Sequence, residues 1–259
     1  MKALKIAVLS TVFLTSAVVA DEHSRTKATV DTSNNWNVSV TATSEYLFRG
    51  LKQTQGDPAL QASIDYNFDG GLYAGAWAST VKWTEEGYMN NNDVETNFFV
   101  GYSDTLGQTG IGYDVGVLQY YYPGTVKNGV ADTDATEIYA GVNKDILGMN
   151  WAVKYSQIVS DDAWGIGDAD GSQYVEANLT VPLTEKLSAL AHVGRSEFDG
   201  NGNDVYDYTD WSLGAEYAVG DYVTVGAGYS DTNTNEANWT LNGEDQGKGQ
   251  TLAWLTYAF

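Results

Sequence analysis

The chain has no cysteine, only three prolines and only two histidines among its 259 residues. The absence of cysteine excludes disulfide bonds and thiolate metal sites. Basic residues are also scarce: 13 Lys and Arg stand against 34 Asp and Glu, so the net charge is −21 and nucleic acid is not expected as a partner. After the first twenty residues there is no run of about 18 apolar residues, which excludes a membrane-spanning helix there.

The first twenty residues differ from the rest of the chain. Lys2 and Lys5 precede an apolar stretch over residues 6–19, and Ala20 follows it with a small side chain. This order predicts a secretory signal peptide over residues 1–20. A membrane anchor is the alternative, but the stretch is short for a spanning helix of about 20 residues. Residues 21–35 are polar and aperiodic, which predicts a flexible lead-in.

Aromatic residues and glycine are abundant, with 18 Tyr, 8 Trp and 28 Gly. From Trp36 onward apolar and polar residues alternate, so that Trp36, Val38 and Val40 share one face of the segment. This period of two is typical of strands with one apolar face. Twelve strands are predicted, at residues 36–46, 59–68, 71–83, 93–103, 109–119, 134–143, 149–159, 172–182, 186–197, 210–218, 221–231 and 249–259.

The connections between these segments alternate between long and short. The long ones are 47–58, 84–92, 120–133, 160–171, 198–209 and 232–248, and the short ones are 69–70, 104–108, 144–148, 183–185 and 219–220. Outer-membrane barrels have this order, with short periplasmic turns, long external loops and an even number of strands. The predicted fold is therefore all-β: a transmembrane, antiparallel, up-and-down β-barrel of about 12 strands over residues 36–259. A secreted soluble β-protein is the alternative.

In the last segment, Ala253, Leu255, Tyr257 and Phe259 share one face, which we expect to contact lipid. Phe259 would then lie at the periplasmic rim, where aromatic rings favour the membrane interface.

Residues 44–83 carry a more specific pattern. It consists of Ser44-x-Tyr46-x-Phe48-Arg49-Gly50, then Gln53-Thr54, then Pro58-Ala59. This arrangement resembles the N-terminal signature of the TorF family of proteobacterial outer-membrane porins. The resemblance implies a non-enzymatic channel in the outer membrane of a Gram-negative bacterium. Lys52 departs from the small polar residue of many relatives, which leaves the solute open.

The end of the chain carries a second likeness. Phe259, with Tyr257 upstream, resembles the assembly signal of outer-membrane proteins. The two resemblances together imply that outer-membrane lipid, lipopolysaccharide, the assembly machinery and small hydrophilic solutes are partners.

If the apolar face contacts lipid, the other face lines the lumen. Residue parity then places inward the acids Glu45, Asp65, Glu95, Asp114, Glu137, Glu176 and Glu216, together with Lys154, His192 and Arg49. Four of the acids lie in the half of their strands that is nearer the long loops, namely Glu45, Glu95, Glu137 and Glu176. A ring of carboxylates there would attract cations. Alternatively, these acids pair with Arg49, Lys154 and Lys82 and plug a small barrel.

Arg49 stands out because it precedes Gly50 at the start of the first long loop. Its guanidinium could anchor the loop by holding a carboxylate or carbonyl groups. The other interpretation is a constriction residue that partly offsets the acidic ring.

Residues 199–210 have a rhythm like that of a calcium loop. Asp199, Asn201, Asn203, Asp207 and Asp210 occupy the ligand positions. Asp204 replaces the required glycine, so a solvated acidic loop is predicted, with calcium as the alternative. No metal or cofactor is expected.

The sequence offers no set of catalytic residues that would indicate an enzyme. His192 is predicted to face the lumen, and no nucleophile–His–acid set can be assembled around it. Glycines within strands, such as Gly226, are expected to leave room inside the barrel.

The predicted function is a porin-like channel for passive diffusion of small hydrophilic solutes or ions, with a preference for cations. A closed structural barrel, whose loops contact lipopolysaccharide, divalent cations or other cells, is the alternative.

Overall fold

The structure is a computed structural model that describes residues 35–259. The predicted signal peptide lies outside the described residues, as does the predicted lead-in except for Asn35. In the described part, no helix has the length and apolar character needed to cross a membrane.

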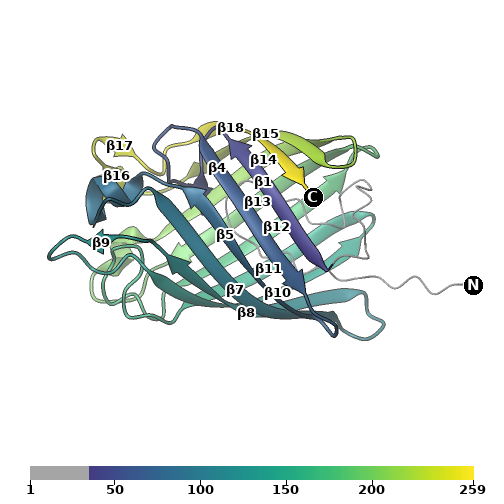
Figure 1. Cartoon of the computed structure of the whole chain (residues 1–259), viewed down its shortest axis with the longest axis horizontal. Helices are drawn as coiled ribbons and strands as arrows, with labels where there is room; N and C mark the ends of the chain where they lie inside the picture. The colour runs from purple at the N-terminus through teal and green to yellow at the C-terminus, as the bar shows by residue number, and fades with distance from the viewer. Residues whose placement is uncertain (1–34) are drawn as a thin grey trace, which may run out of the picture.

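Antiparallel strands close into a single barrel (Figure 1). The twelve barrel strands are β1 (Trp36–Thr43), β4 (Ala59–Asn67), β5 (Leu72–Thr80), β7 (Val94–Thr105), β8 (Ile111–Tyr121), β10 (Ala135–Ile146), β11 (Met149–Ile158), β12 (Gln173–Pro182), β13 (Leu187–Glu197), β14 (Tyr208–Val219), β15 (Val223–Thr232) and β18 (Gln250–Ala258). Each pairs with the next barrel strand in the sequence, and β1 pairs with β18 to close the ring. All twelve predicted strands are confirmed, with ends within three residues of the prediction.

The alternation of residues decides which side chains face the interior. In β18, Leu252 and Trp254 are buried inside the barrel, whereas Leu255 is exposed on its outer surface. Apolar side chains cover the exterior of the other strands too, as with Leu60 at 60% and Leu213 at 57% exposed. The barrel therefore has an apolar exterior, while its buried polar side chains point inward.

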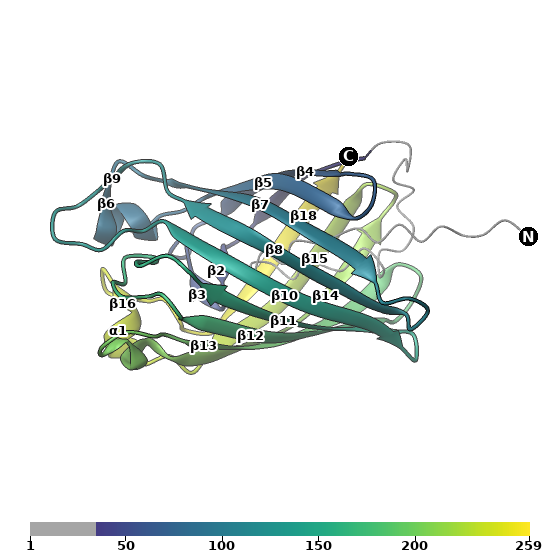
Figure 2. The ribbon, with the colours of Figure 1, turned by 90° about the horizontal axis from the view of Figure 1, so that it is seen from below.

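The two ends of the barrel differ in their connections (Figure 2). At one end the turns span residues 68–71, 106–110, 147–148, 183–186 and 220–222. At the other end the loops span residues 44–58, 81–93, 122–134, 159–172, 198–207 and 233–249. β1 begins and β18 ends at the short-turn end. The predicted alternation of long and short connections is confirmed.

The long loops carry small elements of their own. These are β2 (Leu47–Phe48), β3 (Leu51–Lys52), the π-helical turn η1 (Thr84–Tyr88), β6 (Met89–Asn90), β9 (Thr125–Val126), the 3-10 turn η2 (Asn203–Tyr206), α1 (Glu236–Trp239), β16 (Thr240–Leu241) and β17 (Glu244–Asp245). Of these elements, β2 and β3 lie within the barrel, and others such as β6, β9 and α1 lie beyond its end (Figure 2). β2 pairs with β3 and β16 with β17, while β6 pairs with β9 and so joins the second and third long loops.

Glycines within the strands make room for large rings inside the barrel. A Cβ on Gly194 in β13 would lie 2.0 Å from the hydroxyl oxygen of Tyr174 in β12. A Cβ on Gly226 in β15 would lie 2.1 Å from the ring of Trp254. No side chain fits at such distances, so these rings occupy the room that glycine leaves.

The seam that closes the barrel is its shortest ladder. Five residues of β1, Ser39–Thr43, pair with Trp254–Ala258 of β18, whereas β10 and β11 share ten pairs. Across the seam, the hydroxyl groups of Thr41 and Thr256 form a hydrogen bond of 2.8 Å.

Candidate functional site

The first long loop folds into the barrel and reaches the opposite wall. Its tip is the two-residue turn between β2 and β3, in which Arg49 and Gly50 have φ of 50° and 79°. Positive φ at both central residues is what a tight hairpin turn of this kind requires. A Cβ on Gly50 would lie 2.7 Å from atoms of Asp210 in β14 and Thr232 in β15. The Phe48-Arg49-Gly50 segment is therefore the tip of a hairpin that crosses the lumen.

Arg49 connects this hairpin to the barrel wall. Its guanidinium forms an ion pair with Glu137 of β10, and both side chains are almost fully buried. The guanidinium carbon also lies 4.3 Å from the centre of the Tyr174 ring and 4.9 Å from that of Phe48. Stacking on aromatic faces and pairing with a carboxylate are contacts that suit a planar guanidinium. Both contacts hold the loop in the lumen.

Lys154, the second base predicted to face inward, belongs to a polar network along β11–β14. Its ammonium lies 3.0 Å from Glu176 Oε1. His192 contacts Glu176 through Nδ1 at 3.6 Å and Asp210 through Nε2 at 2.9 Å. Tyr174 donates its hydroxyl to Asp210 Oδ2 at 3.0 Å. Since Tyr174 also underlies Arg49, the network connects the wall to the hairpin.

Glu95 has neutral donors around it. Tyr46 donates its hydroxyl to both carboxylate oxygens at 3.1 Å, and Asn97 donates from Nδ2 at 2.8 Å. Because Tyr46 belongs to the first loop, Glu95 is a second point at which the wall holds that loop.

Glu45 organises its own loop. Its carboxylate accepts hydrogen bonds from the backbone N–H and the hydroxyl of Thr54 and from the backbone N–H of Gly56. Burial raises the pKa of Glu45 above its ordinary value of 4.5, and these hydrogen bonds offset that effect only in part. The four loop-side glutamates therefore do not share one environment: two pair with bases, one accepts from neutral groups and one closes a loop.

The sequence reasoning missed a group of tyrosines in the lumen. Tyr73 donates its hydroxyl to Asp114 Oδ1 at 2.6 Å and lies 2.5 Å from the hydroxyl of Tyr139. The alternation of residues places Tyr73 and Tyr139 inward, but the predicted lumen residues comprise only acids and bases. Polar aromatic rings take up much of the interior and bind the acids to the wall.

Burial of the inward side chains changes along the barrel axis. Glu95, Glu137, Glu176 and Asp210, toward the long loops, are each at most 3% exposed. Toward the short turns burial varies: Asp65, Asn143 and Glu216 are only partly buried, whereas Ser103, Asp114 and Asn150 are buried. The half that contains the first-loop hairpin is therefore the one in which the inward acids Glu95, Glu137, Glu176 and Asp210 are all buried.

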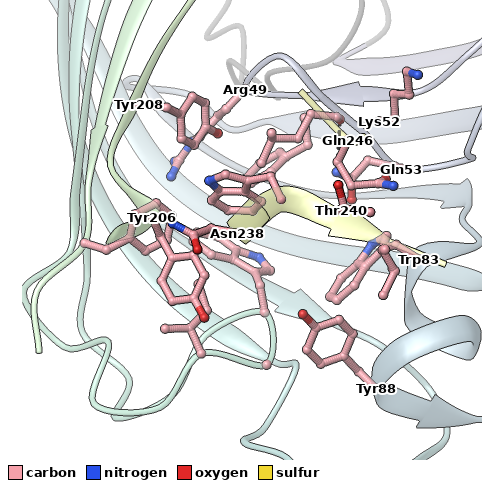
Figure 3. A pocket seen from close by; sticks show the side chains of 18 residues that line it. Arg49, Lys52, Gln53, Trp83, Tyr88, Tyr206, Tyr208, Asn238, Thr240 and Gln246 are labelled. Carbon is pink, nitrogen blue, oxygen red and sulfur yellow. Dashed lines mark hydrogen bonds between the residues drawn. The ribbon is translucent and has the colours of Figure 1, made fainter. Parts of the chain in front are cut away.

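A cavity of about 140 Å³ lies beside this hairpin, among the long loops (Figure 3). Arg49, Lys52 and Gln53 line it from the first loop. Trp83 and Tyr88 lie on one side of it, and Tyr206 and Tyr208 on the other. We refer to it as the aromatic cavity. No sequence signal indicated it, because its residues come from five separate loops.

The predicted assembly residues lie on the exterior. Tyr257 is 40% and Phe259 is 62% exposed, and their rings contact each other edge to face with centroids 4.7 Å apart.

The calcium-like rhythm of residues 199–210 does not form one site. Asp210 lies in β14 and contacts His192 and Tyr174 in the lumen, while Asp207 accepts a hydrogen bond from the backbone of Phe198. Across residues 35–259, no cluster of three or more His, Asp or Glu side chains is arranged to hold a metal ion.

Comparison with known proteins gives a family and a set of similar folds. Residues 27–259 match the model of a family described as "Bacterial protein of unknown function (Gcw_chp)". No curated protein sequence matches the chain.

Solved porin structures are similar in fold. The KdgM porin gives a TM-score of 0.57 at 6% sequence identity, covering 86% of this chain and 99% of that chain; the KdgM porin in complex with disordered oligogalacturonate gives the same values. The NanC porin gives a TM-score of 0.56 at 12% identity, covering 86% of this chain and 98% of that chain. These similarities concern the fold.

Proposed function

The chain belongs to the Gcw_chp family of bacterial proteins. We propose that it is a porin-like channel in the outer membrane, through which small hydrophilic solutes or ions diffuse passively. One observation carries the proposal: the barrel is closed, its exterior is apolar and its interior is lined by polar and charged side chains. An enclosed polar path surrounded by apolar surface is the arrangement that a diffusion channel needs.

The exterior supports membrane insertion. Side chains such as Leu60, Phe98 and Leu213 are at least half exposed, and water would contact them unfavourably. In lipid the same surface is stabilised, and closure of the barrel leaves no unpaired strand edge. In the proposed orientation the long loops face the outside and the short turns face the periplasm. Export by the predicted signal peptide is part of this proposal.

The likeness of residues 44–83 to the TorF family supports the same function. Under this proposal the protein is not an enzyme, and its partners are outer-membrane lipid, lipopolysaccharide, the assembly machinery and small solutes. Tyr257 and Phe259, exposed on the outer face, are proposed to take part in assembly.

We propose a preference for cations on the basis of the charges inside the barrel. The inward acids include Asp65, Asp114, Asp210 and Glu216 in addition to the glutamates already described, whereas the basic side chains in contact with the inward acids are Arg49, Lys154 and His192. A low-dielectric wall strengthens the field of such an excess of negative charge.

Single-channel recording of the refolded full-length protein in a planar bilayer tests the proposal. Stepwise conductance is expected, with gel mobility that differs between folded and boiled samples as proof of folding. Folded protein that gives no steps would refute the channel. That result would favour the closed structural barrel, which the buried hairpin and the buried pair of Arg49 and Glu137 also suit.

A further inference from the structure

The aromatic cavity has the size and the walls of a small-ligand site. Its volume of about 140 Å³ is close to that of a cavity of about 150 Å³ that accommodates benzene, so it has room for one six-membered ring. Eight of the 18 residues that line it are Phe, Tyr or Trp, against 13% aromatic residues in the whole chain. Such an enrichment offers flat surfaces on which a ring can pack.

The charge of the cavity differs from that of the rest of the protein. Arg49 and Lys52 line it and no Asp or Glu does; the carboxylates that pair with them, Glu137 and Glu244 (4.0 Å from Lys52 Nζ), are not among the lining residues. Arg49 already lies 4.9 Å from the ring centre of Phe48 and 5.4 Å from that of Trp164. In a site for a cationic ligand, the aromatic rings would be available to that ligand's own positive charge. Here the guanidinium of Arg49 already contacts two of the rings, so we expect the occupant to be neutral or anionic.

Polar groups of the cavity residues lack partners inside the protein. Within residues 35–259, the indole N–H groups of Trp83, Trp164 and Trp239 and the side-chain oxygen of Gln246 are buried without a hydrogen bond. Gln53 uses its amide nitrogen on the carbonyl of Leu51, which leaves its side-chain oxygen as an acceptor. Buried polar groups without partners are rare and call for an explanation. A ligand rich in hydroxyl groups supplies both acceptors and donors.

From these features we infer that the aromatic cavity binds one six-membered sugar ring, as a neutral hexose or as a hexuronate. The C–H faces of a pyranose carry weak positive charge and pack on the negative faces of aromatic rings. Its hydroxyl groups suit the side-chain amides, and a carboxylate on the ring suits Lys52. The inference rests on the proposed channel, because Arg49 joins the cavity to the lumen and a bound sugar would lie on the path inward.

Tryptophan fluorescence of the refolded full-length protein tests the inference by titration with glucose, galacturonate and open-chain sorbitol. We expect a saturable change with glucose, galacturonate or both, and none with sorbitol. Trp239→Ala is expected to weaken binding about tenfold, the size of one aromatic packing contact. If loss of the Trp239 indole disturbs the loop, Asn238→Ala tests the same wall of the cavity with a smaller change. Trp211→Phe, on the outer surface, is the matched control and should leave the affinity unchanged.

Lys52→Met separates the two classes of sugar. It should weaken galacturonate binding several-fold if the occupant is a hexuronate, and leave glucose binding unchanged. The inference is overturned by the absence of saturation with both sugars, by an equal response to sorbitol, or by unaltered affinity in both the Trp239 and Asn238 variants. Conductance of the same preparation keeps the two proposals apart: steps without sugar binding overturn only this inference, and sugar binding without steps overturns only the channel.

Discussion

Arg49 and Glu137 face each other inside the barrel, one at the tip of the first loop and the other on β10, 88 residues further along the chain. A buried charge whose partner is removed costs about 3–5 kcal/mol, because it stays desolvated without compensation. Arg49→Ala should therefore lower the free energy of unfolding by about that amount and make single-channel currents noisier as the hairpin loosens. Chemical denaturation and bilayer recording measure the two effects.

A matched arginine lies on the surface. Arg195 contacts Glu197 and Asp207 but is 43% exposed, so Arg195→Ala should change stability by less than about 1 kcal/mol. Equal effects of the two substitutions would show that the Arg49 pair does not anchor the hairpin.

Gly194→Ala should disturb the lumen although it adds a single methyl group. The new Cβ would lie 2.0 Å from the Tyr174 hydroxyl, so the ring must move away from Asp210 and from beneath Arg49. A loss of about 1–3 kcal/mol is expected from such overpacking. In Gly141→Ala, also within a strand, the nearest atom is 3.4 Å away, and stability should hardly change. A stable Gly194 variant with wild-type conductance would contradict the packing argument.

Glu45 should make the stability of the folded protein depend on pH. Its pKa is raised above 4.5 by burial, so the folded state holds the proton more tightly than the unfolded state. The contribution of protonated Glu45 to the free energy of unfolding is complete below pH 4.5. It is lost as the pH rises through the higher pKa that Glu45 has in the folded state. Denaturation midpoints of the wild type and Glu45→Gln, measured from pH 4 to pH 8, should diverge across that window. Parallel curves would show that Glu45 does not titrate there.

The pair of Lys154 and Glu176 should contribute no net charge to ion selectivity. Lys154→Met alone is expected to strengthen the preference for cations, and Glu176→Gln alone to weaken it. The double variant removes one charge of each sign, so its reversal potential under a salt gradient should match that of the wild type. If it departs from the wild type as far as either single variant does, effects on the shape of the lumen outweigh charge.

Leu213→Arg should impair insertion because this residue lies midway along β14 and is 57% exposed on the exterior. A charge on the lipid face near the bilayer midplane costs about 2–4 kcal/mol and far less near the interface. Leu106→Arg, in a short turn at the end of the barrel, is the control. Folding yields in lipid vesicles should fall for the first variant and stay near wild type for the second. Equal yields would argue against a lipid-facing exterior.

The strands and their faces could be predicted from the sequence because the period of two is a local property. Leu255 faces outward and Trp254 faces inward because they are neighbours in a strand, where successive side chains alternate between faces. The lengths of the connections could be predicted as well, because they are the intervals between the alternating segments.

The conformation of the long loops could not be predicted in this way. The hairpin enters the lumen because Arg49 meets Glu137 and Tyr174, contacts between segments far apart in sequence. The sequence predicts Asp210 both as the last position of the loop rhythm and as the first residue of a strand, and its position in β14 and its contact with His192 place it in the wall. Spacing along the chain cannot distinguish these two environments when a residue lies at the boundary between a loop and a strand.

The short seam between β1 and β18 has a kinetic consequence. Thr41 and Thr256, which meet across it, are 215 residues apart, so the chain must lose the entropy of a very long loop before the seam can form. All twelve barrel strands can pair with a sequence neighbour, in eleven ladders, before β1 and β18 meet. Until then both edge strands expose unpaired backbone groups that another chain can capture. Misassembly should therefore concentrate at this seam, and a factor that escorts the barrel to completion would act most effectively by shielding these two edges.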